Sequence, residues 1–134
     1  MAGEIRAILE AAGRWVETSG AQGARALLDG MDLRVVGDAF EGRALAGTYA
    51  PRANAVGVSF VGAQLQGASF DGADLRQADF QGADLRGASF IGANLNHARL
   101  AEANVRPLIL PDGRQLPTRF DGAKTEGAGL GGAG

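Results

Sequence analysis

The chain contains no cysteine, one histidine, one tryptophan and four prolines among its 134 residues. Without cysteine it forms neither a disulfide nor a thiolate metal site. No apolar run approaches the roughly 18 residues that a membrane-spanning helix needs. Charged residues, among them Glu4 and Glu10, interrupt the N-terminal segment and speak against a secretory signal. We therefore expect a cytoplasmic protein with no membrane partner.

The charge balance is close to neutral. Thirteen Lys and Arg face fifteen Asp and Glu, which gives a net charge of −2. A nucleic-acid-binding domain usually carries a basic patch and a high isoelectric point. We expect no nucleic-acid partner.

Small residues dominate the composition. The chain holds 22 Gly and 26 Ala, while Leu, Ile, Val and Phe make up about 23%, just above the level below which no core is expected. Composition alone leaves disorder open. The order of the residues has to decide between disorder and a packed structure.

The order shows a five-residue repeat. Alanine recurs every five residues from Ala63 to Ala103, and a Leu, Phe or Val stands two positions after each alanine. With Phe60 upstream, the regular array covers residues 58–106. We expect its repeating apolar residues to face a common lumen: Phe60, Ala63, Leu65, Ala68, Phe70, Ala73, Leu75, Ala78, Phe80, Ala83, Leu85, Ala88, Phe90, Ala93, Leu95, Ala98, Leu100, Ala103 and Val105.

A period of five suits neither a helix nor a continuous strand. Five residues advance about 500° on an α-helix, and an odd spacing on a strand sends successive side chains to opposite faces. Within one repeat, however, Ala-x-Leu alternates, so both apolar residues share one side. The remaining two residues, often ending in Gly, suit a tight turn. The repeat therefore predicts a solenoid.

Four repeats per coil account for the positions of phenylalanine. With twenty residues per coil, Phe40, Phe60, Phe80, Leu100 and Phe120 form one column, and Phe70 and Phe90 form the opposite column. Phe then never occupies two adjacent sides, as a narrow and fully packed lumen requires.

The runs ADLRQ, ADFQG, ADLRG, ASFIG and ANLNH resemble the pentapeptide repeat family, whose pattern is A(D/N)LXX. The resemblance implies an all-β solenoid, a right-handed quadrilateral parallel β-helix, here of about four to five coils. It also implies that the source is bacterial. The match is specific over residues 58–106 and weaker from 24 to 57 and after 107.

An amphipathic helix is expected before the array. Ile5, Ile8, Leu9 and Trp15 recur at helical spacing, and Thr18, Ser19 and Gly20 end the pattern. The helix could bind a partner, but the first coil of a β-helix exposes a strand edge and an open lumen that need a cover. We favour a capping helix with Trp15 as a lid residue.

The flanks complete the expected organisation. We assign residues 1–20 to the capping helix, 21–57 to degenerate first coils, 107–126 to a C-terminal hairpin cap with the last repeats, and 127–134 to a flexible Gly-rich tail. The hairpin is predicted from Leu108-Ile109-Leu110, Pro111-Asp112-Gly113 and Gln115-Leu116. Pro51, with only alanine at positions 50 and 55, predicts an irregular coil there.

No catalytic group is predicted. Asp74, Asp79 and Asp84 lie on three successive sides, so they cannot share a metal ion or act as an acid and base pair. His97 occupies a turn position without a second His or Cys, and we expect it at the surface. We therefore expect no enzyme, no metal and no cofactor.

The outward residues offer candidate interaction surfaces. Asp79 and Arg99, twenty residues apart, are expected to form an ion pair between adjacent coils. Arg86 and Arg106 are expected to stack in one column, with Asp84 neutralising part of its charge. The candidate interaction face therefore consists of Asp79, Asp84, Arg86, Arg99 and Arg106.

Three functions remain open. The first is a rigid scaffold for another protein. The second is a DNA mimic that protects a type II topoisomerase (gyrase), as the family resemblance suggests. The third is a capping or targeting module of a larger assembly. A homodimer through one end of the solenoid is a further option. Mimicry needs acidic columns, but the net charge of residues 59–106 is only −1, from Asp71, Asp74, Asp79, Asp84 and Glu102 against Arg76, Arg86, Arg99 and Arg106.

Overall fold

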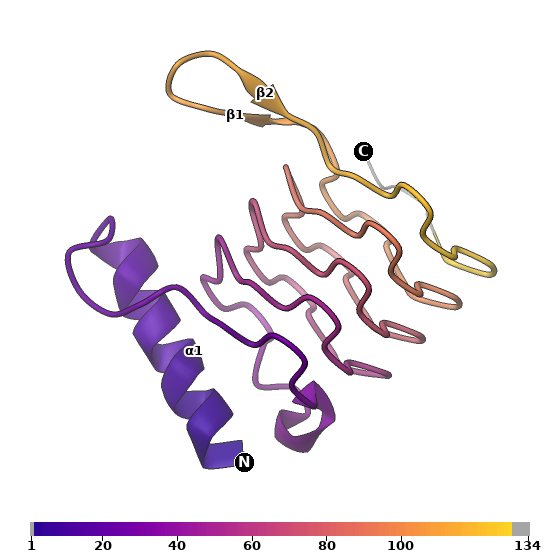
Figure 1. The fold of residues 1–134 in the computed structure, drawn as a ribbon, viewed down its shortest axis with the longest axis horizontal. Coiled ribbons are helices and arrows are strands. Elements are labelled where there is room, and N and C mark those ends of the chain that lie inside the picture. The colour runs from indigo at the N-terminus through magenta and orange to yellow at the C-terminus, as the bar shows by residue number, and fades with distance from the viewer. Residues whose placement is uncertain (1, 130–134) are drawn as a thin grey trace.

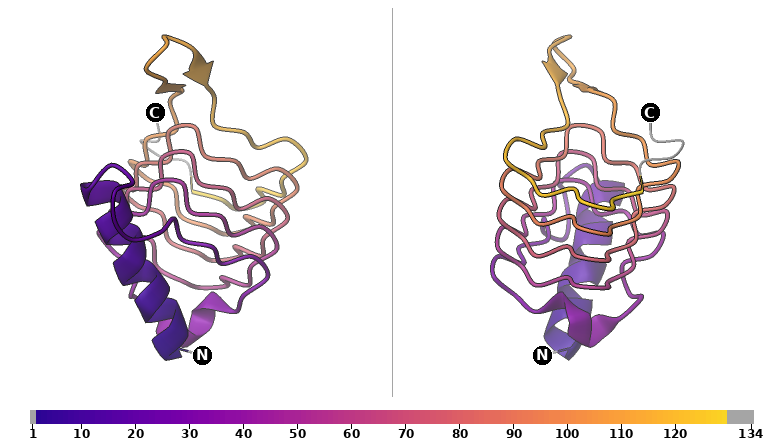
Figure 2. Two further views of the ribbon diagram at one scale, coloured as in Figure 1. Left: turned by 60° about the vertical axis from the view of Figure 1, so that its left-hand side comes forward. Right: turned by 90° about the vertical axis from the view of Figure 1, so that its right-hand side faces the viewer.

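The computed structural model describes residues 2–129, and the chain winds through stacked coils beside one helix (Figure 1). The elements are the helix α1 (Ala2–Glu17), the 3-10 helix η1 (Leu33–Val36) and the short strands β1 (Leu108–Ile109) and β2 (Gln115–Leu116). Most of the remaining structure consists of single parallel bridges between coils. The two views of Figure 2 show the coils stacked along one axis, with α1 beside the first coils and the hairpin projecting outward from the later coils.

The coils repeat every twenty residues. Ser59 pairs with Asp79 and Asp79 with Arg99, always in parallel. Each bridge is closed by backbone hydrogen bonds, such as the one that the Phe60 N–H donates to the Asp79 carbonyl at 2.6 Å. Twenty residues are four repeats, so each coil has four sides of one repeat each.

The lumen holds the repeating apolar residues. All of the alanines and large residues named for it from Phe60 to Ala103 are at most 1% exposed, while Val105 is half-buried. Phe60 and Phe80 stack at 4.8 Å between ring centroids, and Phe70 and Phe90 stack at 5.6 Å. The rings of the two columns meet in a T-shaped arrangement, with the Phe60 and Phe70 centroids 5.5 Å apart. Both phenylalanine columns therefore fill the lumen without a gap between them.

The helix α1 packs against the first coil through Ile5, Leu9 and Ala12, which are at most 1% exposed. Ile8 packs against the core only in part. Trp15 does not act as the expected lid. It is half-buried outside the core cluster, near the turn at Gly47. The shorter aliphatic residues cover the lumen, because they lie on the face of α1 that points at it.

The first coil is irregular at a different place from the one expected. Asp32 pairs with Asn54, twenty-two residues on, because η1 adds two residues to the coil. Ala50 and Ala55, by contrast, are fully buried within regular sides, and Asn54 pairs with Asp74 at the normal spacing. Small residues at these centres therefore do not disturb the coil.

The hairpin of β1 and β2 interrupts the array instead of capping it. Ser89 pairs with Arg119, Asn94 with Lys124 and Arg99 with Gly129, each thirty residues apart. The ten extra residues leave the array as the hairpin, and the chain then resumes the next side (Figure 1). Consequently Phe120 stacks on Phe90 at 5.3 Å, not above Leu100 as the unbroken register predicted.

The final partial coil extends into the expected tail. Gly129 pairs with Arg99 and donates its N–H to the Ala98 carbonyl. Residues 127–129 therefore continue the array, which corrects the boundary predicted at 127. The rest of the predicted tail, residues 130–134, lies outside the described residues.

Candidate interaction surfaces

Each outward Asp or Asn at the middle of a side binds its own turn. The Asp74 and Asp84 carboxylates accept the backbone N–H of the residue two positions on, and the Asn104 amide oxygen does the same. This contact gives a physical reason for Asp or Asn at the second position of the repeat. The side chain fixes the turn that follows it.

Arginine two positions after an aspartate closes a bidentate pair. Arg86 donates from Nε to Asp84 Oδ1 at 2.9 Å and from Nη2 to Oδ2 at 2.7 Å. Arg76 binds Asp74 in the same way. The aspartate charges on these two sides are therefore already neutralised by neighbours in the same repeat.

The pairs shift the acidity of these groups. Burial tends to raise the pKa of Asp84, but the Arg86 hydrogen bonds and charge outweigh it, so the pKa lies below its ordinary value. The Arg76 hydrogen bond likewise lowers the pKa of Asp74. In the first coil, the Arg34 hydrogen bonds lower the pKa of Asp32 to about 2.

The predicted ion pair between Asp79 and Arg99 is absent from residues 2–129, although the two backbones are bridge partners. Asp79 instead accepts the backbone N–H and the side-chain amide of Gln81, both at 3.0 Å. The local turn offers donors at shorter range than the next coil. The prediction of a cross-coil pair is therefore wrong.

Several contacts between side chains of adjacent coils run over eighteen residues rather than twenty. Gln66 donates its amide to Asp84 Oδ2 at 2.9 Å, and Ser59 donates its hydroxyl to Glu41 at 2.7 Å. Sequence reasoning looked only at side chains directly above one another. The longer residue at the following corner is the one that reaches the next coil.

The five predicted interface residues lie on two adjacent sides. Asp79 and Arg99 share the side that includes Ser59, and we call it the Asp79 face. The other side carries Asp84, Arg86 and Arg106 together with their neighbours, and we call it the Asp84 face. Its outward residues are Gln64, Gln66, Asp84, Arg86, Asn104 and Arg106.

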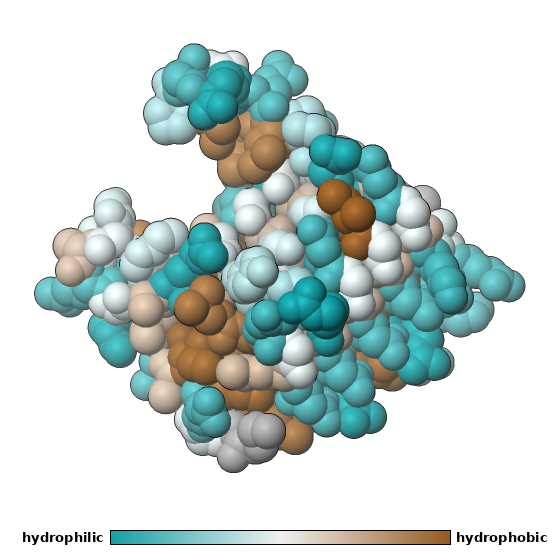
Figure 3. Space-filling model, viewed as in Figure 1, coloured by the Kyte–Doolittle hydropathy of each residue, from teal (hydrophilic) through white to brown (hydrophobic). Residues whose placement is uncertain are grey.

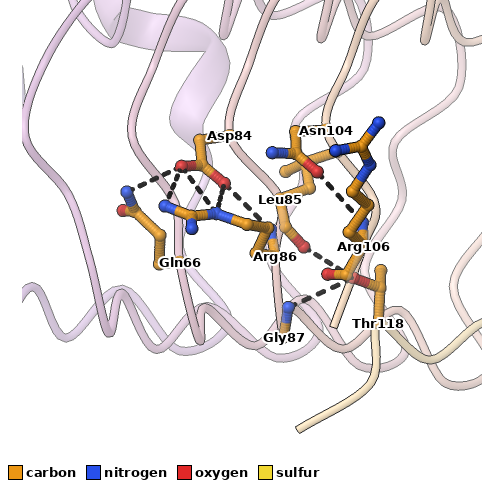
Figure 4. Close-up of polar contacts among 8 residues, drawn as sticks. All are labelled: Gln66, Asp84, Leu85, Arg86, Gly87, Asn104, Arg106 and Thr118. Carbon is orange, nitrogen blue, oxygen red and sulfur yellow. Dashed lines mark hydrogen bonds and ion pairs between the residues drawn. The ribbon is translucent and has the colours of Figure 1, made fainter. Parts of the chain in front are cut away.

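Figure 4 shows how the Asp84 face is ordered. Arg86 folds back over Asp84, and Gln66 approaches the same carboxylate from the coil below. Thr118, which the sequence analysis did not select, donates its hydroxyl to the Leu85 carbonyl at 2.8 Å and accepts the Gly87 N–H. Thr118 thereby fixes the end of the hairpin insertion to the coil below.

His97 lies at the surface, as the sequence predicts. His97 is exposed at a turn with a φ of 63°, and its ring lies against Gly127 of the last coil. Across residues 2–129 no cluster of three His, Cys, Asp or Glu side chains could hold a metal ion. Within the same range no helix is both long and apolar enough to cross a membrane.

The period of twenty and the filled lumen define a β-helix solenoid. A family model for pentapeptide repeats matches residues 40–77 and 68–106 with eight copies, together half of the chain. The chain therefore belongs to the pentapeptide repeat family, whose fold is a right-handed β-helix.

Solved structures of pentapeptide repeat proteins are similar to this chain. Rfr23 from the cyanobacterium Cyanothece 51142 has 22% identity and a TM-score of 0.38, covering 63% of this chain and 54% of its own. HetL from Nostoc sp. strain PCC 7120, involved in heterocyst differentiation regulation, has 26% identity and a TM-score of 0.30, covering 81% and 61%. A trypsin-treated variant of QnrB1, a plasmid-mediated fluoroquinolone resistance protein, has 18% identity and a TM-score of 0.36, covering 81% and 69%.

The chain spans between one half and two thirds of the length of Rfr23 and HetL. A search of the curated proteins found no match. The family assignment therefore rests on the repeat itself.

Proposed function

We propose that this chain is a non-enzymatic scaffold that binds another protein through its outward faces. The supporting observation is that inward and outward residues of each repeat have separate roles. Ala and Leu or Phe fill the lumen, and the residue between them points outward at a position fixed by backbone bridges on both sides. Outward side chains can therefore vary without loss of the core, as in other solenoid binding proteins.

Rigidity also favours binding. The Asp84–Arg86 and Asp74–Arg76 pairs hold long side chains in one conformation. A surface that is ordered before binding loses less conformational entropy when a partner docks. Exposed salt bridges add little stability on their own. Their main effect here is to fix the pattern that the surface presents.

A DNA mimic that protects gyrase remains the second hypothesis, and the arrangement of charge weighs against it. Mimicry of phosphates requires columns of uncompensated carboxylates along the rod. Asp74 and Asp84 each lie within 2.7 Å of an arginine nitrogen. A supercoiling assay with purified gyrase and a quinolone tests this hypothesis. Protection at micromolar protein supports mimicry, and no protection removes it.

The remaining hypotheses concern the ends of the rod. A capping or targeting module of a larger assembly, or a homodimer, would use an end of the solenoid. Phe120 and Ala123 are only partly buried in the last coil. A dimer that covers them would make the sedimentation coefficient depend on protein concentration.

A comparison of faces tests the scaffold. Affinity capture from a lysate of the source organism would use the wild-type chain, Asp79→Lys for the Asp79 face, Arg86→Glu for the Asp84 face and Arg76→Glu for the side that carries Asp74. The scaffold predicts a partner that one variant loses and the other two retain. Equal capture by all variants, or no specific capture, contradicts it. Unchanged melting temperatures would show that the variants fold.

A further inference from the structure

On the Asp84 face, Arg106 follows an asparagine at the position where Arg86 follows an aspartate. In three repeats an Asp binds the arginine two residues on: Asp32–Arg34, Asp74–Arg76 and Asp84–Arg86. At the next position of the Asp84 face the same spacing reads Asn104–Arg106. Asn104 still accepts the Arg106 backbone N–H at 3.1 Å, so the turn is unchanged. The Arg106 guanidinium therefore has no carboxylate at the position that Asp84 occupies beside Arg86.

Arg106 is exposed, and its side chain makes no ion pair within residues 2–129. Figure 4 shows it one coil beyond the paired Arg86, with its guanidinium directed away from that pair. Asp84 is engaged by Arg86 and Gln66, so it has little capacity left for Arg106. The charges of Asp84, Arg86 and Arg106 sum to +1, located at Arg106.

Two further features lie on or next to the Asp84 face. The Gln66 Oε1 atom is buried and accepts no hydrogen bond among the described residues. The hairpin starts immediately after Arg106 and exposes apolar side chains, with Ile109 at 59% and Leu116 at 39% exposed. Figure 3 shows the hairpin standing away from the coils, with an apolar surface beneath it and a hollow between it and the N-terminal segment. Arg106 therefore directly precedes, in the chain, a hairpin that exposes apolar side chains.

We infer that the Asp84 face binds an acidic segment of a partner protein, in which an Asp or Glu pairs with Arg106 and an adjacent apolar side chain packs on the hairpin. The partner carboxylate takes the place that Asp84 occupies on Arg86. Arginine forms strong bidentate pairs with carboxylates and is enriched at the energetic centres of interfaces. This inference rests on the proposed scaffold function and names its surface and the chemistry of its partner.

The length of the segment follows from the coil spacing. Stacked strands lie about 4.8 Å apart, so the Gln66 and Arg106 levels are separated by roughly 10 Å. An extended peptide rises about 3.3 Å per residue, so about three to four residues span that distance. A segment of this length therefore covers the Asp84 face from the Gln66 level to the Arg106 level while its carboxylate binds Arg106.

Peptide selection tests the inference. A phage-displayed library of random dodecapeptides is selected against the full chain, and selected peptides are measured by fluorescence anisotropy. We expect an Asp or Glu next to an apolar residue in the enriched sequences. Arg106→Glu should weaken binding at least tenfold. Arg99→Glu, the same charge change on the Asp79 face, should alter binding less than twofold.

Asn104→Asp provides a second variant that leaves Arg106 in place. It restores the Asp-x-Arg spacing, so Arg106 should pair internally and peptide binding should fall about tenfold without a loss of melting temperature. Unchanged affinity in Asn104→Asp or Arg106→Glu, enrichment of peptides without acidic residues, or no enrichment overturns the inference. Binding of a random single-stranded DNA oligonucleotide in place of peptides, with the same sensitivity to Arg106→Glu, also overturns it.

The scaffold and this inference can fail separately. If affinity capture finds a partner that is lost only in Asp79→Lys or Arg76→Glu, the scaffold stands and the Asp84 face is not its binding surface. If no face variant affects capture, the scaffold itself fails.

Discussion

Phe120 stacks on Phe90 with ring planes only 5° apart, although thirty residues separate them in the chain. Neighbouring rings elsewhere in the columns, such as Phe60 and Phe80, are separated by twenty. The difference of ten residues is the hairpin insertion, which is two repeats long. The insertion therefore preserves the five-residue phase and shifts the array by two sides.

This relationship predicts that the hairpin can be removed. Deletion of residues 107–116 leaves the centres Val105 and Phe120 five positions apart, as in a regular repeat. We expect a folded protein whose free energy of unfolding changes by less than about 2 kcal/mol, because the hairpin contributes no residue to the buried core. Circular dichroism and urea denaturation measure this. Loss of the cooperative transition would show that the hairpin is needed to resume the array.

Alanine substitutions at two corner glycines distinguish steric contact with the hairpin from backbone strain. Gly67 and Gly87 have φ values of 69° and 70°, so alanine at either position costs about 1 kcal/mol in the left-handed region. A Cβ at Gly67 has no atom within 4 Å, whereas at Gly87 it lies 2.8 Å from Leu108 Cβ.

We expect Gly87→Ala to be more destabilising than Gly67→Ala by about 1–3 kcal/mol, as for other overpacked sites. Gly87→Ala should also speed trypsin cleavage in the hairpin, where Arg114 is exposed. Urea denaturation and the rate of cleavage measure the two effects. If both variants behave alike, the hairpin does not pack on this corner.

Acid should weaken the solenoid through its Asp–Arg pairs. The pKa values of Asp74 and Asp84 are lowered in the folded state. The folded carboxylates therefore bind protons less readily than the unfolded ones. The stability that these groups supply is present above the ordinary pKa of about 3.9 and is lost as the pH falls through their folded values.

The measurement is urea denaturation at pH 6 and at pH 3. Asp84→Asn should be less stable than the wild type at pH 6, and the gap should narrow at pH 3. Asp38→Asn is the control, because Asp38 is exposed and forms no ion pair in the described chain. A gap that is constant with pH would contradict a role for the Asp84 charge.

The sequence predicts the periodic part of the fold because one physical constraint acts on every repeat. The lumen accepts only small residues and one large residue per side, so Phe60 and Phe80 are placed by counting. The two extra residues in η1 could not be predicted in this way, because Leu33 and Phe40 fit an apolar lumen position whether or not the coil contains an insertion. The position of Phe120 was missed because an insertion of ten residues keeps the period of five.

The surface was less predictable than the lumen. Counting placed Asp79 under Arg99 correctly, but side chains choose the nearest donors, and for Asp79 these belong to Gln81. The Asp-x-Arg spacing within one repeat was visible in the sequence as DLR at Asp74 and Asp84. A search for side-chain contacts two residues apart would have found these pairs.

The central claim is that adjacent residues of one repeat have separate roles, the inward one holding the rod and the outward one remaining free for recognition. Urea denaturation of Leu85→Asp and Asp84→Leu tests this claim most directly. Leu85 is fully buried, so its replacement places an unpaired charge in the lumen and should abolish the cooperative transition. Asp84→Leu should keep that transition and cost less than about 1.5 kcal/mol, because it removes hydrogen bonds at a partly exposed site. A cooperative Leu85→Asp transition at the wild-type midpoint, or equal losses in the two variants, would contradict the account.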